Sequence, residues 1–177
     1  MKTVVTSVLV LLFASLSVGA QPGKRPKRDL TPFEGTWVLK KTSQKVFSAE
    51  TWHITTDYLE LRITKIRTQG SRSSTNHLNL FVDKRGEENA LLGTAGGGWT
   101  ETSKTSWEDG AIVRRYQRTQ KQTAAEKMFS SDHLRLSNDG KRLTVLTLDC
   151  PEFMWPTNPS QERAMCFDYT RIFEKEL

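Results

Sequence analysis

The sequence predicts an all-β protein folded as an antiparallel, up-and-down β-barrel of about eight to ten strands. Three features of the 177-residue chain lead to this prediction. Several segments alternate apolar and polar residues, Asp-Gly pairs separate neighbouring segments, and no stretch has the period of an amphipathic helix. Many short strands joined by tight turns form a sandwich or a closed barrel, and closure removes exposed strand edges.

Residues 1–20 have the pattern of a secretory signal peptide. Lys2 supplies a positive start, an apolar run extends from Val4 to Leu16, and small residues follow up to Ala20. The run is shorter than the roughly 20 residues that a membrane-spanning helix needs, which disfavours the alternative of a retained anchor. We therefore expect cleavage near Ala20 and a secreted or periplasmic mature protein.

Residues 21–32 are interpreted as a linker, because proline, glycine and like charges cluster there. The chain carries a net charge of +6, of which Lys2 supplies one and residues 21–29 supply a net three, so residues 30–177 carry +2. Two interpretations of this basic tail stay open: a solvated spacer, or a segment that binds anionic material of the cell envelope. Its cations are Lys24, Arg25, Lys27 and Arg28.

Residues 33–177 form the predicted barrel domain, and its strands alternate with a period of two. In the segment Tyr58–Ile66, Leu59, Leu61 and Ile63 share one face, while the other carries polar and charged residues. That pattern is typical of a half-buried strand. The remaining predicted strands are Leu78–Val82, Trp99–Trp107, Ala111–Thr119, Lys127–Ser137, Leu143–Leu148 and Ala164–Phe173.

Turn residues separate these strands. Glu108–Gly110 and Asn138–Lys141 contain Asp-Gly, a strong hairpin signal because glycine adopts positive φ without steric cost. Two further turns are predicted at Gly70–Ser74 and Gly86–Asn89, and single helical turns at Ala49–Trp52 and Gln120–Lys127.

The predicted barrel domain opens with a recognisable motif. In Phe33-Glu-Gly-Thr-Trp-Val-Leu39, the Gly-x-Trp resembles the entry motif of lipocalins and the wider calycin group. Three later segments resemble a family of small secreted bacterial proteins called lipocalin-like: Thr100–Val113, Leu136–Val145 and Tyr169–Lys175. The resemblance extends from Phe33 to Leu177 and implies a β-barrel. It implies no particular ligand, because most members of that family have no assigned function.

The same resemblance assigns a structural role to two residues. In lipocalins the tryptophan of the entry motif packs against an arginine of the last strand. The matching residues here are Trp37 and Arg171, so the resemblance implies a guanidinium lying over an indole face. The alternative is that Trp37 is an ordinary core residue and Arg171 is solvated.

The sequence contains no pattern typical of catalysis or metal binding. His53, His77 and His133 are too far apart for a local zinc motif. Ser130–His133 brings a hydroxyl, a carboxylate and an imidazole together, but catalytic triads are built from separated segments. Gly96–Gly98 lacks the lysine of a phosphate-binding loop. We therefore expect no metal, no cofactor and no enzymatic activity.

Arg114, Tyr116 and Arg118 fall on one face of the predicted strand Ala111–Thr119. If that face is outside, it is a charged sheet surface, and a secreted destination disfavours nucleic acid as its partner. If the face points inward, it favours an anionic ligand. Tyr116 is preferred over Arg115 as an interior residue, because its ring can be buried while its hydroxyl finds a partner.

Cys150 and Cys166 are the two cysteines of the chain. An even number of cysteines in an exported protein predicts a disulfide, which here closes the proline-rich segment Pro151–Met165. The alternative of a redox or metal-binding pair is disfavoured, because no other cysteine or histidine stands beside either residue.

Alternation also predicts which residues line the barrel. Eight apolar or aromatic residues are expected to face one interior: Leu59, Leu61, Ile63, Leu78, Leu80, Val82, Phe167 and Tyr169. The candidate ligand-binding residues are Tyr116, Leu61, Ile63, Leu80, Phe167 and Tyr169. A pocket in this interior is expected to be mainly apolar, with a few polar groups that orient the ligand.

Three hypotheses for function follow. The first is a secreted or periplasmic barrel that binds a small apolar or amphipathic ligand without catalysis, or has a structural role in the cell envelope. The second is an interaction module that docks on the cell envelope through its basic N-terminal tail. The third is an enzyme with a site on the barrel rim, for which the sequence contains no constellation.

The signal-peptide pattern makes a direct prediction about the mature protein. Because small residues end the apolar run at Ala20, the exported chain should begin at Gln21. N-terminal sequencing of the exported protein measures this directly. An exported chain that still begins with Met1 would contradict the prediction.

Overall fold

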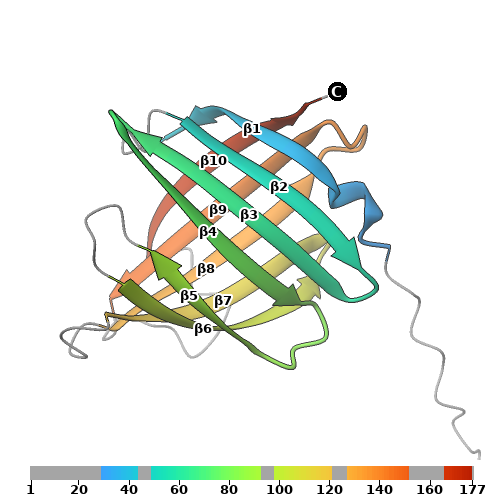
Figure 1. Cartoon of the computed structure of the whole chain (residues 1–177). Coiled ribbons are helices and arrows are strands. Elements are labelled where there is room, and N and C mark those ends of the chain that lie inside the picture. The colour runs from blue at the N-terminus through green and yellow to red at the C-terminus, as the bar shows by residue number, and fades with distance from the viewer. Residues whose placement is uncertain (1–28, 44–48, 93–97, 121–126, 152–165, 177) are drawn as a thin grey trace, which may run out of the picture.

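The protein is described by a computed structural model that covers residues 29–43, 49–92, 98–120, 127–151 and 166–176 (Figure 1). The expected signal peptide and basic linker therefore lie outside the described residues, apart from residues 29–32. The described chain holds one 3-10 helix, η1 (Thr31–Phe33), and ten strands. The strands are β1 (Gly35–Thr42), β2 (Ala49–Asp57), β3 (Glu60–Gln69), β4 (Arg72–Phe81), β5 (Glu87–Leu92), β6 (Gly98–Glu108), β7 (Ala111–Gln120), β8 (Lys127–Leu136), β9 (Arg142–Pro151) and β10 (Phe167–Lys175).

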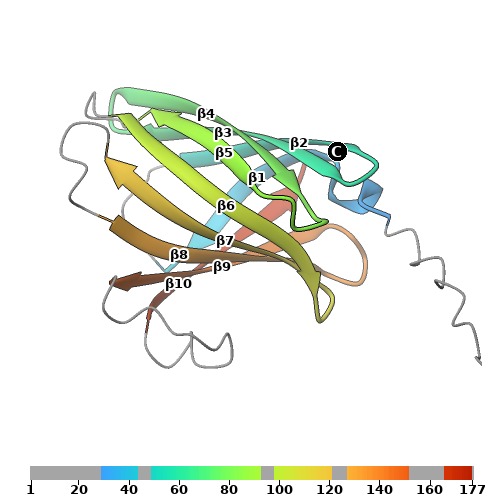
Figure 2. The ribbon, with the colours of Figure 1, turned by 90° about the horizontal axis from the view of Figure 1, so that it is seen from below.

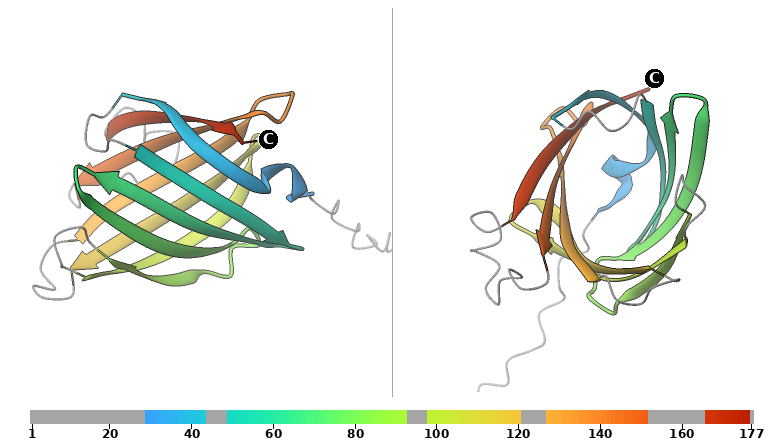
Figure 3. Two further views of the ribbon diagram at one scale, coloured as in Figure 1. Left: turned by 45° about the horizontal axis from the view of Figure 1, so that its top comes forward. Right: turned by 90° about the vertical axis from the view of Figure 1, so that its left-hand side faces the viewer.

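All ten strands belong to one antiparallel sheet in the order β4-β3-β2-β1-β10-β9-β8-β7-β6-β5. Consecutive strands pair with one another except β4 and β5, and β1 also pairs with β10. The sheet curves until its two outer strands, β4 and β5, approach each other, so that it nearly closes into a barrel (Figure 3). The predicted all-β, antiparallel barrel is confirmed, at the upper end of the expected strand number.

Side chains rather than a backbone ladder join the two outer strands of the sheet. The backbone N–H of Asn79 donates to Oδ1 of Asn89 at 3.0 Å, and the N–H of Phe81 donates to Oε1 of Glu87 at 2.6 Å. Ser103 on β6 donates to the other oxygen of Glu87 at 2.8 Å. Strands β4 and β5 lie side by side (Figure 2). Backbone groups need hydrogen-bond partners, and these β5 side chains supply them where the two strands form no ladder.

The predicted Asp-Gly turns form tight hairpins. Asp109 and Gly110 have φ values of 46° and 75°, and they connect β6 to β7 with Glu108 opposite Ala111. Positive φ at both central residues matches the right-handed twist of the strands that they join. Gly140 has a φ of 68° in the turn between β8 and β9. These local signals were reliable because they depend on backbone sterics alone.

One local prediction was wrong and two were misplaced. Ala49–Trp52 is the start of β2 rather than a helical turn, because Glu50, Trp52 and Ile54 alternate onto the inner face. The turn expected at Gly70–Ser74 is present but limited to Gly70 and Ser71, because β4 begins at Arg72, and the turn expected at Gly86–Asn89 lies earlier, at residues 82–86, because β5 begins at Glu87. The helical turn expected over Gln120–Lys127 falls mainly on residues 121–126, outside the described residues.

An apolar core fills the end of the barrel near η1. The indole Nε1 of Trp37 donates to the carbonyl of Phe33 at 2.8 Å, which holds η1 against the barrel. The Phe33 ring meets Trp107 edge-on, with 6.0 Å between ring centroids. The buried cluster comprises Leu30, Phe33, Trp37, Trp52, Ile54, Leu61, Ile63, Leu78, Leu80, Val82, Ile112, Leu134, Leu143, Val145 and Phe173.

Most of the residues expected in the interior are in or against this core. Leu61, Ile63, Leu78, Leu80 and Val82 are buried, Leu59 is half-buried against the core, and Tyr169 is half-buried. The prediction for Phe167 was wrong: this side chain is 75% exposed, because it belongs to the first residue of β10, at the end of the strand.

The expected pairing of Trp37 with Arg171 is also wrong. The cation over Trp37 is Lys175, whose Nζ lies 5.3 Å from the ring centroid. The Arg171 guanidinium lies 5.3 Å from the ring of Trp52 and is buried, not solvated. The register explains the difference, because Trp37 pairs with Lys175 across β1 and β10. Arg171 lies four residues before Lys175 in β10, opposite Thr42.

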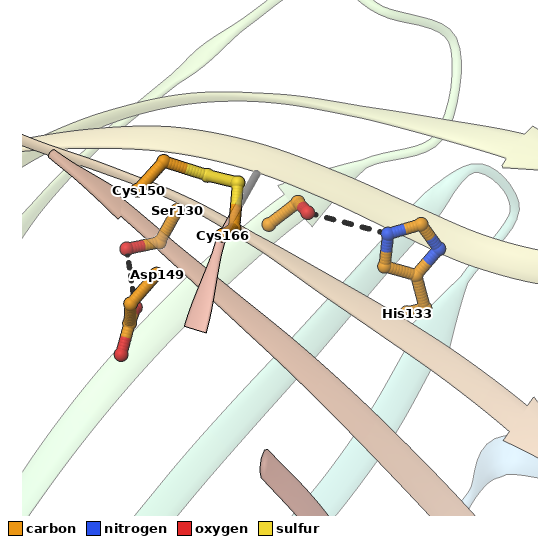
Figure 4. The surroundings of a disulfide bond; sticks show 6 residues. Ser130, His133, Asp149, Cys150 and Cys166 are labelled. Atoms are coloured by element: carbon orange, nitrogen blue, oxygen red, sulfur yellow. Dashed lines mark hydrogen bonds between the residues drawn. A yellow bond between two sulfur atoms is a disulfide. The ribbon is translucent and has the colours of Figure 1, made fainter. Parts of the chain in front are cut away.

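The predicted disulfide is confirmed. Cys150 near the end of β9 and Cys166 just before β10 are bonded, with 4.6 Å between their Cα atoms (Figure 4). The bond joins adjacent strands at the end of the barrel opposite η1 (Figure 1). We call this the disulfide end and the opposite one the η1 end.

Replacement of both cysteines by serine should lower the free energy of unfolding by about 3 kcal/mol, because the bond closes a loop of about 15 residues in the unfolded chain. Urea denaturation of the mature protein measures the loss. Wild-type protein treated with a reductant is the matched control and should lose the same stability. Equal denaturation midpoints for the variant and the oxidised wild type would contradict a stabilising bond.

Candidate functional site in the barrel interior

The inner face of the barrel changes from apolar to charged along the barrel axis. On β3 the inward residues Leu61 and Ile63 lead to Lys65. On β10 the buried Phe173 is followed, toward the disulfide end, by Arg171. Side chains alternate across a strand, so a charged residue in phase with apolar core residues points into the barrel.

We call the charged and polar residues of the disulfide half the interior polar cluster. These side chains come from β2, β3, β6, β7, β8, β9 and β10, and most are buried. The cluster comprises Glu50, Lys65, Arg67, Glu101, Arg114, Tyr116, Arg118, Ser130, Asp132, Thr147, Asp149, Tyr169 and Arg171.

Glu50 is the acceptor at the β2 side of the cluster. Nη1 of Arg171 donates to Oε1 of Glu50 at 3.0 Å, and Nε of Arg67 lies 3.2 Å from the same oxygen. The indole of Trp52 also donates to this oxygen, at 2.5 Å. Burial alone would raise the pKa of Glu50, but the charges of Arg171 and Arg67, together with Lys65 and the Trp52 hydrogen bond, lower it. Glu50 is therefore a fully charged carboxylate inside the barrel.

Asp132 on β8 is the acceptor at the centre of the cluster. Its Oδ1 accepts a hydrogen bond from Thr147 at 2.6 Å and lies 3.5 Å from Nη2 of Arg171. Its Oδ2 lies 3.4 Å from Nη1 of Arg114. Burial would raise the pKa of Asp132, yet the positive charges of Lys65, Arg171 and Arg114 outweigh burial and hold it far below its ordinary value.

Glu101 and Tyr116 complete the β6 and β7 side. Glu101 forms ion pairs with Arg114 and with Arg118, the latter at 3.1 Å. Both guanidiniums lie over the Tyr116 ring. The Cζ atom of Arg114 is 4.3 Å from the ring centroid, and the Cζ atom of Arg118 is 4.8 Å from it. Burial raises the pKa of Tyr116 and also that of Tyr169, so both phenols stay neutral and can donate hydrogen bonds.

Lys65 differs from the other cations of the cluster. The residue is 7% exposed, and its Nζ lies 4.2 Å from the centroid of the Trp52 ring. Among the described residues, no carboxylate lies within ion-pair distance of Nζ and no hydrogen bond reaches it. Burial lowers the pKa of Lys65 well below its ordinary value; nearby Asp132 opposes that effect, whereas Arg114, Arg171 and Arg67 reinforce it.

Two of the buried guanidiniums keep an unused donor. Nε of Arg114 and Nε of Arg171 have no hydrogen-bond partner within the described part of the chain. Buried polar groups in proteins are nearly always bonded to protein or to water. These donors are therefore available to an acceptor that enters the cluster.

The expected site residues divide between the two halves of the interior. Leu61, Ile63 and Leu80 belong to the apolar core, and Tyr116 and Tyr169 belong to the polar cluster. Phe167 lies in neither half, as its exposure shows. The open choice between an outward and an inward face is settled for Arg114 and Tyr116, which are buried in the interior. Arg115 lies on the opposite strand face, where it pairs with Glu108 at 2.8 Å.

Sequence reasoning missed Glu50, Lys65 and Asp132 as interior residues. A signal was present on β3, because Lys65 continues the alternation of Leu61 and Ile63 on the same face. The ordinary interpretation of a lysine at such a position is a solvated strand end, and the sequence offers nothing local against it.

The serine, histidine and acid near the disulfide do not form a catalytic triad. Ser130 donates to Asp149 at 2.6 Å on the inner face, whereas His133 bonds Ser131, 3.2 Å away (Figure 4). Residues 130 and 131 point to opposite faces of β8. His53 and His77 each bond a threonine, Thr36 or Thr64, at 3.0 Å. No group of three or more potential metal ligands occurs among the described residues.

Comparison with models of known protein families finds no match to this chain. Comparison with curated proteins finds none either. In the described ranges, no helix is both long enough and apolar enough to cross a membrane. The barrel and its interior polar cluster are the observations that bear on function.

Asp132→Asn should lower the free energy of unfolding by about 3–5 kcal/mol, because removal of one charge from a buried ion pair leaves its partners uncompensated. Urea denaturation at neutral pH measures the loss. Asp57→Asn is the matched control, since this exposed carboxylate faces Arg62 at 3.7 Å and should matter little. Equal losses in the two variants would contradict a central role for Asp132.

The lowered pKa of Asp132 also predicts a pH dependence. The carboxylate contributes its full stability above its ordinary pKa of 3.8 in the unfolded chain, and this contribution is lost as pH falls below that value toward the lower folded pKa. Acid unfolding followed by circular dichroism should therefore be less steep in Asp132→Asn than in wild type between about pH 5 and pH 2. Parallel curves would contradict the assignment.

Proposed function

We propose that this protein is a secreted or periplasmic, lipocalin-like β-barrel that binds one small amphipathic ligand and catalyses no reaction. The observation that carries the proposal is the change of the interior from apolar to charged along the barrel axis. Apolar side chains such as Ile63 and Leu78 lie next to Lys65 and Arg171. A ligand with an apolar body and a polar group matches both halves of such an interior.

The unused donors indicate what the polar group of the ligand is. Nε of Arg114 and Nε of Arg171 are donors that have no hydrogen-bond partner among the described residues. A group that accepts hydrogen bonds, such as a carboxylate or a carbonyl oxygen, would satisfy them, and charge-assisted bonds of this kind are the stronger ones. A cationic ligand would instead add charge beside Lys65 and Arg67. The ligand is therefore an amphipathic acceptor rather than an amphipathic amine.

The disulfide supports the proposed location, because such bonds persist in oxidising compartments outside the cytosol. The proposed cleavage near Ala20 rests on the sequence. An alternative proposal, docking on anionic envelope material through Lys24, Arg25, Lys27 and Arg28, also rests on the sequence, since these residues lie outside the described ranges.

The proposal is tested with anilinonaphthalene sulfonate, an amphipathic anion whose fluorescence rises in apolar surroundings. We expect the probe to bind the mature protein, dodecanoate to displace it, and dodecyltrimethylammonium to leave it bound. Arg118→Gln should weaken binding of this anion roughly tenfold, because it removes a cation of the interior polar cluster, and a hydrogen-bonded interaction with a charged group is worth about 1.5–3 kcal/mol. The matched control is Arg115→Gln. Arg115 lies on the outer face of the same strand, so this variant should bind the probe like wild type.

Absence of probe binding, or displacement by the cationic lipid as readily as by dodecanoate, would overturn the proposal. Equal weakening by Arg118→Gln and Arg115→Gln would place the probe on the outer surface and would overturn it as well. Circular dichroism of both variants confirms that the comparison is made between folded proteins.

A further inference from the structure

We infer that the Lys65 amine is an attachment site for amphipathic aldehydes, which it holds as a reversible imine. This inference rests on the proposed function, because the aldehyde is taken up as the amphipathic ligand of the same interior. It goes further by naming the reactive atom, Lys65 Nζ, and the chemical class of the ligand.

The first argument is the isolation of the amine. Lys65 is more than nine-tenths buried, and its Nζ has neither an ion-pair partner nor a hydrogen-bond partner among the described residues. A buried ammonium without a counter-ion is costly, so Lys65 loses its proton more readily than an exposed lysine does. The neutral amine has the free electron pair that attacks carbonyl carbon.

The second argument is that the surrounding carboxylates are already engaged by arginines. Glu50 pairs with Arg171 and Arg67, with 3.0 Å and 3.2 Å between the closest atoms. Glu101 pairs with Arg114 and Arg118, and Asp132 lies between Arg114 and Arg171. Arginine keeps its charge in proteins, so lysine is the cation of this cluster that can become neutral. The lowered pKa of Lys65 agrees with this conclusion.

The third argument is the position of Lys65 at the border between the two halves of the interior. Its cross-strand neighbours are Trp52 on β2 and Asn76 on β4. The preceding inward residue on β3 is the buried Ile63, which lies opposite Leu78. A carbonyl carbon at Nζ therefore places the apolar body of the ligand beside apolar side chains. The carbonyl oxygen faces the donors of the polar cluster.

The chemistry balances without any further reactant. The nitrogen electron pair forms a bond to the carbonyl carbon, and one nitrogen proton moves to the oxygen to give a carbinolamine. The carbinolamine then loses its hydroxyl together with the second nitrogen proton as water, and a carbon–nitrogen double bond forms. One aldehyde is consumed and one water is released. Nothing is oxidised or reduced, and addition of water reverses the step.

The test uses decanal as the probe and sodium cyanoborohydride to trap the imine as a stable secondary amine. The mature protein is incubated with an equimolar amount of decanal at neutral pH, reduced, and analysed by intact mass spectrometry and peptide mapping. We expect one decyl adduct per chain, located on Lys65. Lys65→Arg, which keeps the positive charge, should lose that adduct. Lys104→Arg, at an exposed outer-face position on β6, should keep it.

Two further readouts keep the inference falsifiable. If Lys65→Arg does not fold, peptide mapping of the wild type alone decides, since at least tenfold more adduct on Lys65 than on any other lysine is expected. A spread of adducts over surface lysines overturns the inference. If anilinonaphthalene sulfonate and dodecanoate bind but decanal leaves Lys65 unmodified, the aldehyde inference fails and the proposed function stands. If neither binding nor modification occurs, both fail.

Discussion

The interior of this barrel depends on Arg171, the residue of β10 that connects the strands on both of its sides. Its guanidinium donates to Glu50 on β2 and to Thr147 on β9, and it lies 3.5 Å from Asp132 on β8. Glu50 and Arg171 are separated by 121 residues in the chain. Each charge buried in the barrel needs a partner, so one substitution in this network leaves several charges uncompensated.

Polar groups at the β4–β5 seam need partners, just as the charges of the interior do. Backbone N–H groups of β4 face β5 without forming a ladder, and the side chains of Glu87 and Asn89 supply the acceptors. This arrangement closes the barrel with fewer hydrogen bonds than a paired strand would provide. Local opening of the barrel is therefore expected at this seam.

The two halves of the interior differ in polarity, and we expect a structural role for the apolar half and a functional role for the charged half. The η1 half is filled by apolar and aromatic side chains that stabilise the fold. The disulfide half retains arginine donors without partners in the described residues and an isolated lysine amine. Buried polar groups of this kind cost stability, and proteins keep such costs mainly where a ligand or a reaction uses them. The proposed binding of an amphipathic ligand uses these groups.

The sequence by itself determined the all-β class, the Asp-Gly hairpins and the disulfide pairing, because these depend on local backbone sterics, on alternation and on the number of cysteines. Alternation also placed Arg114, Tyr116 and Arg118 on one face, but it cannot say which face is inside. Only the tertiary structure decided that Lys65 is buried and that Arg171 meets Glu50 rather than Trp37. Those contacts join strands far apart in sequence, and their geometry exists only once the sheet has curved and its register is set.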